Sequence, residues 1–212
     1  MPHYFEPSPG AAPADLRDVV VDLPGGPARM ATAPGVFSAR RLDPGTRVLL
    51  RLESRLADLP DAVPPPPAPS HLLDLGCGWG PVAAGLARLA PGATVWAVDV
   101  NPRALELTRL NAERLGLGNI RVAAPNEVPP EIRFDAIWSN PPIRVGKAEL
   151  RALLRLWLAR LTPAGRADLV VHKNLGADSL ASWLDSEPGF AAAKLASAKG
   201  YRILRVTRRP AP

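Results

Sequence analysis

Between residues 134 and 143 the chain reads Phe-Asp-Ala-Ile-Trp-Ser-Asn-Pro-Pro-Ile, an apolar run of strand length that stops at an asparagine and two prolines. A buried strand that ends in this way leaves polar groups at the carboxyl edge of its sheet, where open α/β sheets bind ligands. The prolines fix the backbone and donate no hydrogen bond, which should keep the carbonyls out of a continuing helix. Oδ1 of Asn140 and the carbonyl of Pro141 would then form two acceptors suited to an exocyclic amino group. Taken alone, Asn-Pro-Pro indicates only a strand-ending turn, so the choice depends on the rest of the chain.

A glycine-rich segment, Asp74-Leu-Gly-Cys-Gly-Trp-Gly80, follows an apolar strand and opens a helix. Glycines at this position let the backbone turn sharply and pass close to a ligand. The Gly-x-Gly-x-Gly spacing differs from the Gly-x-Gly-x-x-Gly of dinucleotide dehydrogenases. Asp74 would repel a pyrophosphate and attract an ammonium group. The segment therefore favours the aminoacyl end of S-adenosylmethionine, which carries an amine and a sulfonium but no phosphate.

Asp99 comes at the end of the second strand of this unit. A carboxylate there can accept hydrogen bonds from both hydroxyls of a ribose, although it could also cap the helix that follows Asn101. The joint spacing with Asp74 favours ribose binding. Cys77, the single cysteine, is interpreted as a small spacer, because no neighbouring histidine or lysine would activate it as a nucleophile. Three scattered histidines and one cysteine make no metal set, so no metal is expected.

Strands alternate with helices from residue 70 onward. The expected strands are 72–75, 94–100, 120–124, 134–139, 168–172, 190–198 and 201–208. The expected helices are 82–89, 103–115, 149–161 and 175–184. Such alternation is typical of βαβ units with helices on both faces of a parallel sheet, and the closing strand pair adds an antiparallel edge. The pattern predicts an α/β fold, doubly wound, with a mostly parallel seven-stranded sheet.

The residues before this core form a small, β-rich N-terminal extension. A strand at 18–23, a turn at 24–27 and a returning strand at 28–33 are expected, followed by a helix at 47–59. A proline-rich connector at 61–69 should be stiff and extended. We expect residues 1–212 to form a single domain, with 1–69 as extension and connector and 70–212 as the cofactor-binding catalytic core.

Composition limits the classes of protein that need to be considered. Of the 212 residues 47% are hydrophobic, enough for a sizeable core. The sequence contains no secretory signal and no apolar run of about 18 residues, so a cytoplasmic protein without membrane contact is expected. The net charge of +6 serves either solubility or attraction to polyanions, with nucleic acid first among them.

In this order, Asp74-x-Gly-x-Gly, Asp99 and Asn140-Pro-Pro resemble the motifs of class I S-adenosylmethionine-dependent methyltransferases. More closely, the chain resembles the methyltransferase small-domain family, which includes the guanine-N2 methyltransferases of small-subunit ribosomal RNA and single-domain archaeal relatives. The likeness extends over nearly the whole chain. It includes Pro34-Gly-Val-Phe-Ser38, Leu42-Asp-Pro-Gly-Thr46, Ser139-Asn-Pro-Pro-Ile-Arg-Val-Gly-Lys147 and Gly200-Tyr-Arg-Ile-Leu204. The resemblance implies a Rossmann-like methyltransferase fold with S-adenosylmethionine as cofactor.

The resemblance also implies roles for residues outside the central motifs. The segment 42–46 would close over the methionine end of the cofactor, with Phe37 on the same side. Asn126 stands where the wider family has an aspartate that touches adenine, and Ile143 stands where many relatives have an aromatic that stacks on the target base. The two-domain bacterial enzymes have an additional amino-terminal domain that is not seen in this chain.

Motifs and resemblance together predict three sets of site residues. The catalytic set is Asn140, Pro141, Pro142 and Ile143. The cofactor-binding set is Asp43, Thr46, Asp74, Gly76, Cys77, Gly78, Gly80, Asp99, Val100, Asn126 and Asn140. The substrate-binding set is Phe37, Arg144, Lys147 and Arg202. Arg144, Lys147 and Lys173 could equally be solvated turn residues. The basic carboxyl-terminal run of Lys199, Arg202, Arg205, Arg208 and Arg209 is either a guarded sheet edge or a patch for RNA phosphates.

The predicted reaction is methylation of an exocyclic amine, with guanine N2 of ribosomal RNA as the first expected acceptor and RNA or a ribosomal subunit as the partner. Two alternatives remain open. The acceptor could be DNA adenine, a protein glutamine or a small molecule. The chain could also be a non-catalytic RNA-binding assembly factor, which would not need the two acceptors of Asn-Pro-Pro. Nothing in the sequence indicates the oligomeric state.

Overall fold

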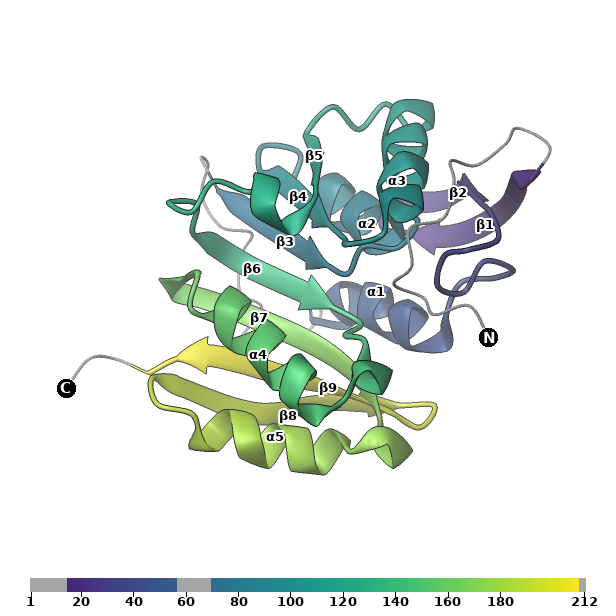
Figure 1. Ribbon diagram of the computed structural model, residues 1–212. Helices are drawn as coiled ribbons and strands as arrows, with labels where there is room; N and C mark the ends of the chain where they lie inside the picture. The colour runs from purple at the N-terminus through teal and green to yellow at the C-terminus, as the bar shows by residue number, and fades with distance from the viewer. Residues whose placement is uncertain (1–14, 57–69, 210–212) are drawn as a thin grey trace.

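The computed structural model describes residues 15–56 and 70–209, and Figure 1 shows a central sheet with helices on both faces. The seven strands lie in the order β5-β4-β3-β6-β7-β9-β8. They are β3 His71–Leu75, β4 Thr94–Val98, β5 Ile120–Ala123, β6 Phe134–Ser139, β7 Leu161–His172, β8 Phe190–Ala198 and β9 Tyr201–Arg208. The strands from β5 to β7 are parallel, whereas β9 runs antiparallel to both of its neighbours, β7 and β8. The predicted doubly wound fold with an antiparallel edge is confirmed.

Two hydrophobic layers cover the two faces of the sheet. The helices are α1 Pro44–Leu56, α2 Pro81–Leu89, α3 Pro102–Arg114, α4 Lys147–Leu158 and α5 Ala177–Ser186. Leu72 and Trp138 pack in the layer that contains side chains of α1, α2 and α3. Their neighbours Leu73 and Ile137 pack in the other layer, with α4 and α5. This alternation follows from the two-residue period of a strand.

The N-terminal extension forms a hairpin that is separate from the main sheet. Its strands, β1 Arg17–Leu23 and β2 Gly26–Thr32, pair antiparallel, as predicted. Val21 and Met30 are fully buried in the same layer as α2 and α3, so the hairpin packs onto the core. The predicted connector at 61–69 lies outside the described residues, and the division of the chain at residue 69 stays a prediction.

Several element boundaries differ from the sequence prediction. β7 begins at Leu161 instead of residue 168, and its register with β6 shifts between Phe134 and Ala136. Pro163 lies in this irregular part, where a strand needs no continuous ladder. The helix expected at 149–161 is therefore α4, Lys147–Leu158. α1 begins at Pro44, not residue 47, α5 begins two residues late, and β4 stops before Asp99.

The carboxyl ends of the strands meet at one edge of the sheet. From β3 the chain adds β4 and β5 on one side and then β6 and β7 on the other, so the strand order reverses between β3 and β6. Open α/β sheets bind ligands at such a switch point. Three short 3₁₀ helices follow strands at this edge: η2 Pro125–Glu127, η3 Ile143–Val145 and η4 Lys173–Leu175.

Candidate active site

The loop between β3 and α2 has a backbone that suits glycine. Gly76, Gly78 and Gly80 have φ angles of 78°, 56° and 90°, in the left-handed region that other residues rarely adopt. The N–H of Gly76 donates to the carbonyl of Val98 at 2.8 Å, which ties the loop to the end of β4. A Cβ on Gly80 would lie 2.9 Å from Cγ2 of Thr108. The glycines therefore allow both the tight turn and the close approach of α3.

Asp74 lies on β3 just before this loop and is almost completely buried. Its Oδ2 accepts a hydrogen bond from the N–H of Ala83, in the first turn of α2, at 2.8 Å. Burial raises the pKa of Asp74 to about 8; the Ala83 hydrogen bond opposes this shift and the charge of Asp99 reinforces it. No lysine or arginine of the described residues pairs with Asp74. A buried carboxyl of this kind is suited to a ligand that brings its own positive charge.

Asp99 lies directly after β4 and holds the glycine loop in place. Its Oδ2 accepts a hydrogen bond from the N–H of Gly78 at 2.9 Å, and its Oδ1 accepts one from the N–H of Asn101, also at 2.9 Å. Burial raises the pKa of Asp99, and backbone N–H groups, including these two, lower it. The helix cap is Asn101, whose Oδ1 accepts from the N–H of Arg103. Asp99 is thus not the cap, and each of its oxygens keeps a lone pair for a ligand hydroxyl.

Asn140 follows β6, and two groups at the start of α1 hold its side-chain amide. Nδ2 donates to Oδ2 of Asp43 at 2.8 Å and to Oγ1 of Thr46 at 3.1 Å. The same Asp43 oxygen accepts the backbone N–H of Thr46 at 3.0 Å, which caps the first turn of α1. With Nδ2 engaged, Oδ1 has no partner among the described residues and can accept from an N–H donor.

The backbone after Asn140 forms a tight turn. The N–H of Ile143 donates to the carbonyl of Pro141 at 2.8 Å. Proline at 142 offers no N–H, and the next N–H, that of Ile143, folds back onto this carbonyl in a turn, so the carbonyl is not taken into a continuing helix, as expected. A carbonyl has two lone pairs, so one remains available. Ile143 is partly buried and packs against the hydrophobic layer of α4 and α5.

A cavity that is open to solvent brings the two ends of the site together; about 380 Å³ of empty space lies in and above it, part of which is open solvent. Eight predicted residues line it: Phe37, Asp43, Thr46, Asp74, Gly76, Cys77, Gly78 and Asn140. Asp74 and Asn140 come from neighbouring strands on either side of the switch point and face the same space. The cavity can therefore hold a cation on one side and an amine donor on the other.

A comparison with known proteins places this arrangement in a family. The model of the family described as Methyltransferase small domain matches residues 27–205 of this chain. This chain belongs to that family. The match includes α1, the glycine loop and Asn140, so it covers all elements of the cavity.

Relatives of this methyltransferase small domain differ in length. This chain is 32% identical to the uncharacterized protein YbxB of Bacillus subtilis, and the match covers 82% of this chain and 83% of that protein. It is 33% identical to the ribosomal RNA small subunit methyltransferase C of Pseudomonas entomophila, covering 95% of this chain and 58% of that enzyme. The solved T. thermophilus 16S rRNA N2 methyltransferase RsmC, in complex with AdoMet and guanosine, has a TM-score of 0.74 and 30% identity, covering 93% of this chain and 52% of that chain. This chain thus spans a little over half the length of the two named enzymes.

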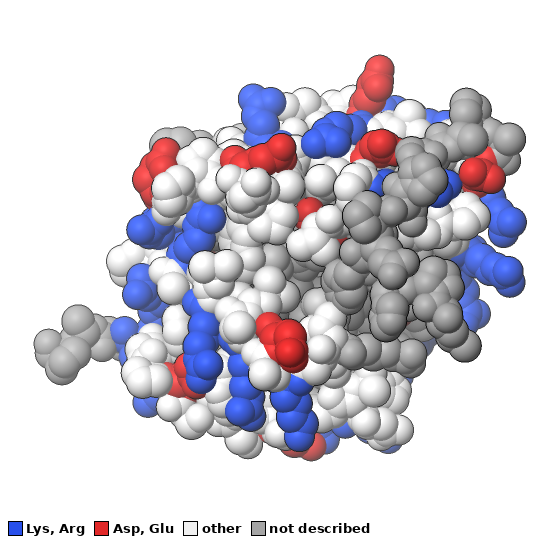
Figure 2. Space-filling view, in the orientation of Figure 1, with Lys and Arg blue, Asp and Glu red and all other residues white. Residues whose placement is uncertain are grey.

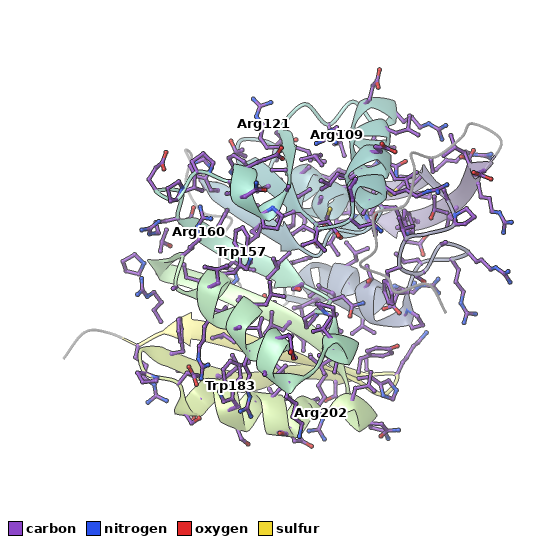
Figure 3. The ribbon with its side chains drawn as sticks, in the orientation of Figure 1. Arg109, Arg121, Trp157, Arg160, Trp183 and Arg202 are labelled. Atoms are coloured by element: carbon purple, nitrogen blue, oxygen red, sulfur yellow. The ribbon has the colours of Figure 1, made fainter. Side chains whose placement is uncertain are left out.

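The other predicted residues of this methyltransferase small domain lie outside the cavity lining. They are Gly80, Asp99, Val100, Asn126, Pro141, Pro142, Ile143, Lys147 and Arg202. Lys147 is exposed at the start of α4. Arg202 forms an ion pair with Asp178 beside α5 (Figure 3), on the face that carries α4 and α5. The side chain of Arg144 is outside the description.

Some residues that line the cavity were not named among the predicted site residues, although Leu42 belongs to the segment that was expected to close over the cofactor. Ser38, Leu42, Trp79, Pro81 and Val82 also line the cavity. Four of them adjoin predicted residues and Val82 follows Pro81, so the signal for all five was their place in or beside the two motifs.

Tyr201 was also missed, although it borders the start of α1. A Cβ on Gly45 would lie 2.7 Å from Cε1 of the Tyr201 ring, so a larger residue there would force the ring to shift. Burial, with the nearby charge of Asp43, raises the pKa of Tyr201. The tip of the β8–β9 hairpin therefore lies against the first turn of α1.

Cysteine, metal and membrane features complete the description of this methyltransferase small domain. Burial raises the pKa of the Cys77 thiol further above its ordinary value, which disfavours a thiolate nucleophile. Within residues 15–56 and 70–209 no group of three or more His, Cys, Asp or Glu side chains could hold a metal ion. No helix in these ranges is long and apolar enough to cross a membrane.

Proposed function

We propose that this protein is an S-adenosylmethionine-dependent N-methyltransferase whose acceptor is N2 of guanine in ribosomal RNA. The observation that carries the proposal is the cavity shared by Asp74 and Asn140. The relatives named for methylation of small-subunit ribosomal RNA support this acceptor. An enzyme with this substrate would work in the cytoplasm.

The residues around Asp74 fit S-adenosylmethionine. The carboxyl is buried, has a pKa raised to about 8 and has no cationic partner among the described residues. The ammonium group of the cofactor would supply that missing charge, and the glycine loop would lie along its methionine part. Asp99, fixed by the N–H groups of Gly78 and Asn101, would accept the ribose hydroxyls. Bound in this way, the cofactor supplies an electrophilic methyl group on its sulfonium.

Asn140 and Pro141 would hold the acceptor. Guanine N2 is a poor nucleophile, because its lone pair is delocalised into the ring. Oδ1 of Asn140 and the remaining lone pair of the Pro141 carbonyl would accept its two hydrogens, orient the nitrogen lone pair on the methyl carbon and stabilise the developing positive charge. Orientation can lower a barrier by up to about 7–11 kcal/mol, and preorganised acceptors add to this. The methylated nitrogen is acidic enough to release its proton to water, so no dedicated base is needed.

Asp43 and Thr46 would act as positioning residues in this scheme. They bind Nδ2 of Asn140 and so present Oδ1 to the acceptor. If the Asn140 amide were rotated by half a turn, its Nδ2 would instead face the N–H groups of the acceptor amine and could not accept their hydrogens. The target base also has to leave any stack in order to enter the cavity.

Transfer of labelled methyl groups tests the proposal. The protein and S-adenosylmethionine with a labelled methyl group would be incubated in four parallel reactions. Each reaction contains one possible substrate: total RNA, stripped small ribosomal subunits, DNA or cell protein. The expected product is N2-methylguanosine in ribosomal RNA, identified after digestion to nucleosides. Label found only in DNA or protein would show that the acceptor is not RNA. Absence of label from every sample would favour a binding role without turnover.

Asn140→Ala is the matching variant. It should abolish methyl transfer and leave the dissociation constant for the cofactor nearly unchanged, because the acceptors are lost and Asp74 is not. A large loss of cofactor affinity in this variant would show that Asn140 has a different role.

A further inference from the structure

Two groups of positive side chains on this protein differ in their partners. Many cations away from the cavity are neutralised by a carboxylate. These pairs are Arg29 and Arg114 with Asp18, Arg51 with Asp22, Arg155 with Glu187, Arg202 with Asp178, Arg205 with Asp168 and Arg209 with Asp185. Figure 2 shows Lys and Arg mixed with Asp and Glu on the face that carries α4 and α5.

The second group, here called the rim cations, consists of exposed side chains on three parts of the chain: the segment that leads into α1 and its first turn, the start of α4, and the carboxyl end of β7 with the β8–β9 turn. They are Arg40, Arg41, Arg47, Lys147, Lys173 and Lys199. None of these six side chains forms a hydrogen bond or ion pair with another residue that the structure describes. Their charge is therefore available to an external anion without the loss of an existing pair.

One half of the rim belongs to the segment that leads into α1. Arg40 and Arg41 lie in a turn between the cavity residues Ser38 and Leu42. The turn is fixed by the hydroxyl of Ser38, which donates to the carbonyl of Arg41 at 2.7 Å. Arg47 follows the cavity residue Thr46 within the first turn of α1. These three charges thus stand on a part of the chain whose backbone is held at the cavity.

The other half of the rim is formed by the carboxyl end of β7 and the β8–β9 hairpin. The N–H of Lys173 donates to the carbonyl of Gly200 at 2.8 Å, so Lys173 and Lys199 are close along adjoining segments. The hairpin tip reaches the first turn of α1 through the contact between Tyr201 and Gly45. Lys147 begins α4 just beyond the turn that follows Asn140.

We propose that a single-stranded stretch of RNA crosses the mouth of the cavity with its phosphates on the rim cations, an inference that rests on the function proposed above. The carboxylate of Asp43 lines the cavity and repels phosphate, which leaves the rim as the place for the backbone. The exocyclic amine of one unstacked base then reaches Asn140. Arg202, Arg205 and Arg209, which the sequence analysis considered for RNA, are neutralised by aspartates and contribute little.

The salt dependence of RNA binding tests this surface without catalysis. A fluorescently labelled, unstructured RNA oligonucleotide would be titrated with protein at several salt concentrations. The double variants Arg40→Gln/Arg41→Gln and Lys173→Gln/Lys199→Gln should each reduce the slope of log affinity against log salt by about 1.4, since each phosphate contact on a single strand contributes about 0.7. Thermal unfolding of each variant checks that the fold is kept.

A matched control removes two charges far from the cavity. Arg121, on the outer strand β5 (Figure 3), and Lys194, on the outer strand β8, are exposed and have no ion pair among the described residues. Arg121→Gln/Lys194→Gln should keep the wild-type slope. The proposal is overturned if the rim variants keep the wild-type slope, or if the control loses as much as they do. RNA binding through the rim without methylation of any RNA would instead contradict the proposed function alone.

Discussion

At the scale of single residues, the orientation of the Asn140 amide is set by its neighbours and not by its own strand. β6 brings Asn140 to the sheet edge, but the choice between Oδ1 and Nδ2 depends on Asp43 and Thr46. Asp43 also caps α1 through the N–H of Thr46. One carboxylate therefore serves both a helix end and the candidate catalytic amide.

Asp43→Asn should weaken both of these hydrogen bonds. One oxygen, Oδ2, accepts both from Nδ2 of Asn140 and from the N–H of Thr46. The neutral amide oxygen of the variant is a weaker acceptor than a carboxylate oxygen, so the Asn140 amide is held less firmly in its orientation. We expect kcat to fall about 10-fold to 100-fold, the scale of losing one preorganised group, with the cofactor dissociation constant nearly unchanged. Steady-state kinetics and titration calorimetry measure both quantities.

Asp22→Asn is the control for this variant, because Asp22 is an exposed carboxylate paired with Arg51 on the surface. It should leave kcat and cofactor affinity as in the wild type. If Asp43→Asn weakened cofactor binding and left kcat intact, Asp43 would belong to the cofactor and not to Asn140.

Asp74 makes cofactor binding depend on pH. Its carboxyl in the free protein has a pKa of about 8, so below that pH it is mostly protonated, whereas a cationic ligand requires the carboxylate. Binding should therefore release a proton, and affinity should rise by about tenfold per pH unit as pH approaches 8 from below. Calorimetry in buffers of different ionisation enthalpy counts the protons. Asp74→Asn should bind the cofactor weakly and with an affinity that does not depend on pH in this range. A wild-type affinity for the cofactor that stays constant between pH 6 and 8 would exclude the role given to Asp74.

The same carboxyl affects folding with the opposite trend. The folded-state pKa of about 8 lies above the ordinary value of 3.8, so the folded protein holds a proton that the unfolded chain releases. The contribution of Asp74 to stability is therefore fully present below about pH 4 and is lost as pH rises to about 8. Without ligand, Asp74→Asn should gain in melting temperature relative to wild type over this range.

Sequence reasoning at this scale identified groups with strong local context and missed contacts made across the chain. Asp74 and Asn140 stand beside glycine and proline motifs, and both line the cavity. The contact of Asp43 with Asn140 joins residues 97 positions apart, and no local pattern indicates it. Tyr201 was missed for the same reason, since its contact with Gly45 depends on how the β8–β9 hairpin meets α1.

At the scale of elements, buried asparagines attach the N-terminal hairpin to the nucleotide side of the sheet. Asn111 of α3 is 1% exposed. Its Oδ1 accepts from the N–H of Ala31, and its Nδ2 donates to the carbonyls of Ala31 and Trp79. A second link joins Asn101 to the carbonyl of Gly35. The hairpin and the glycine loop are thus held by the same side chain.

Asn111→Ala should be strongly destabilising, because it leaves several buried backbone groups without partners. We expect the free energy of unfolding to fall by about 2–4 kcal/mol, given about 1–3 kcal/mol for each buried group left unsatisfied. Urea denaturation followed by tryptophan fluorescence measures the change. Asn174→Ala, at an exposed position, is the control and should stay within about 0.5 kcal/mol of wild type. A loss in Asn111→Ala no larger than that of the control would mean that water replaces these hydrogen bonds.

The type and order of the elements followed from the sequence, while several boundaries did not. Apolar runs of strand length and helical periodicity predicted all seven strands of the main sheet. The early start of β7 was hidden, because Pro163 and Gly165 interrupt the pattern where the register with β6 shifts. The starts of α1 and α4 depend on capping and turn geometry, which side-chain periodicity does not record.

At the scale of the whole molecule, an acidic cavity lies inside a chain of net charge +6. Asp43 and Asp74 line the cavity, whereas the rim cations lie outside it. Salt screens exposed charges at distances beyond about 8–10 Å and buried ones far less. The two ligands should therefore respond differently to ionic strength.

Raising salt from 50 to 200 mM should separate cofactor binding from RNA binding. RNA affinity should fall roughly tenfold or more, as expected for several phosphate contacts. The cofactor dissociation constant should change less than about twofold, since its main charge partner is buried. Fluorescence anisotropy and calorimetry on the same protein sample give the two values. Equal responses of both ligands would indicate that the cofactor is held by surface charge.

Because Asp43 both caps α1 and holds the Asn140 amide, methyl transfer depends on the first turn of α1. If residues 43–46 unwind, the Asn140 amide becomes free to rotate, while the glycine loop and the sheet keep their own hydrogen bonds. A binding partner or a substitution that only loosens this turn would therefore stop methyl transfer, while circular dichroism and thermal unfolding would still report a folded protein.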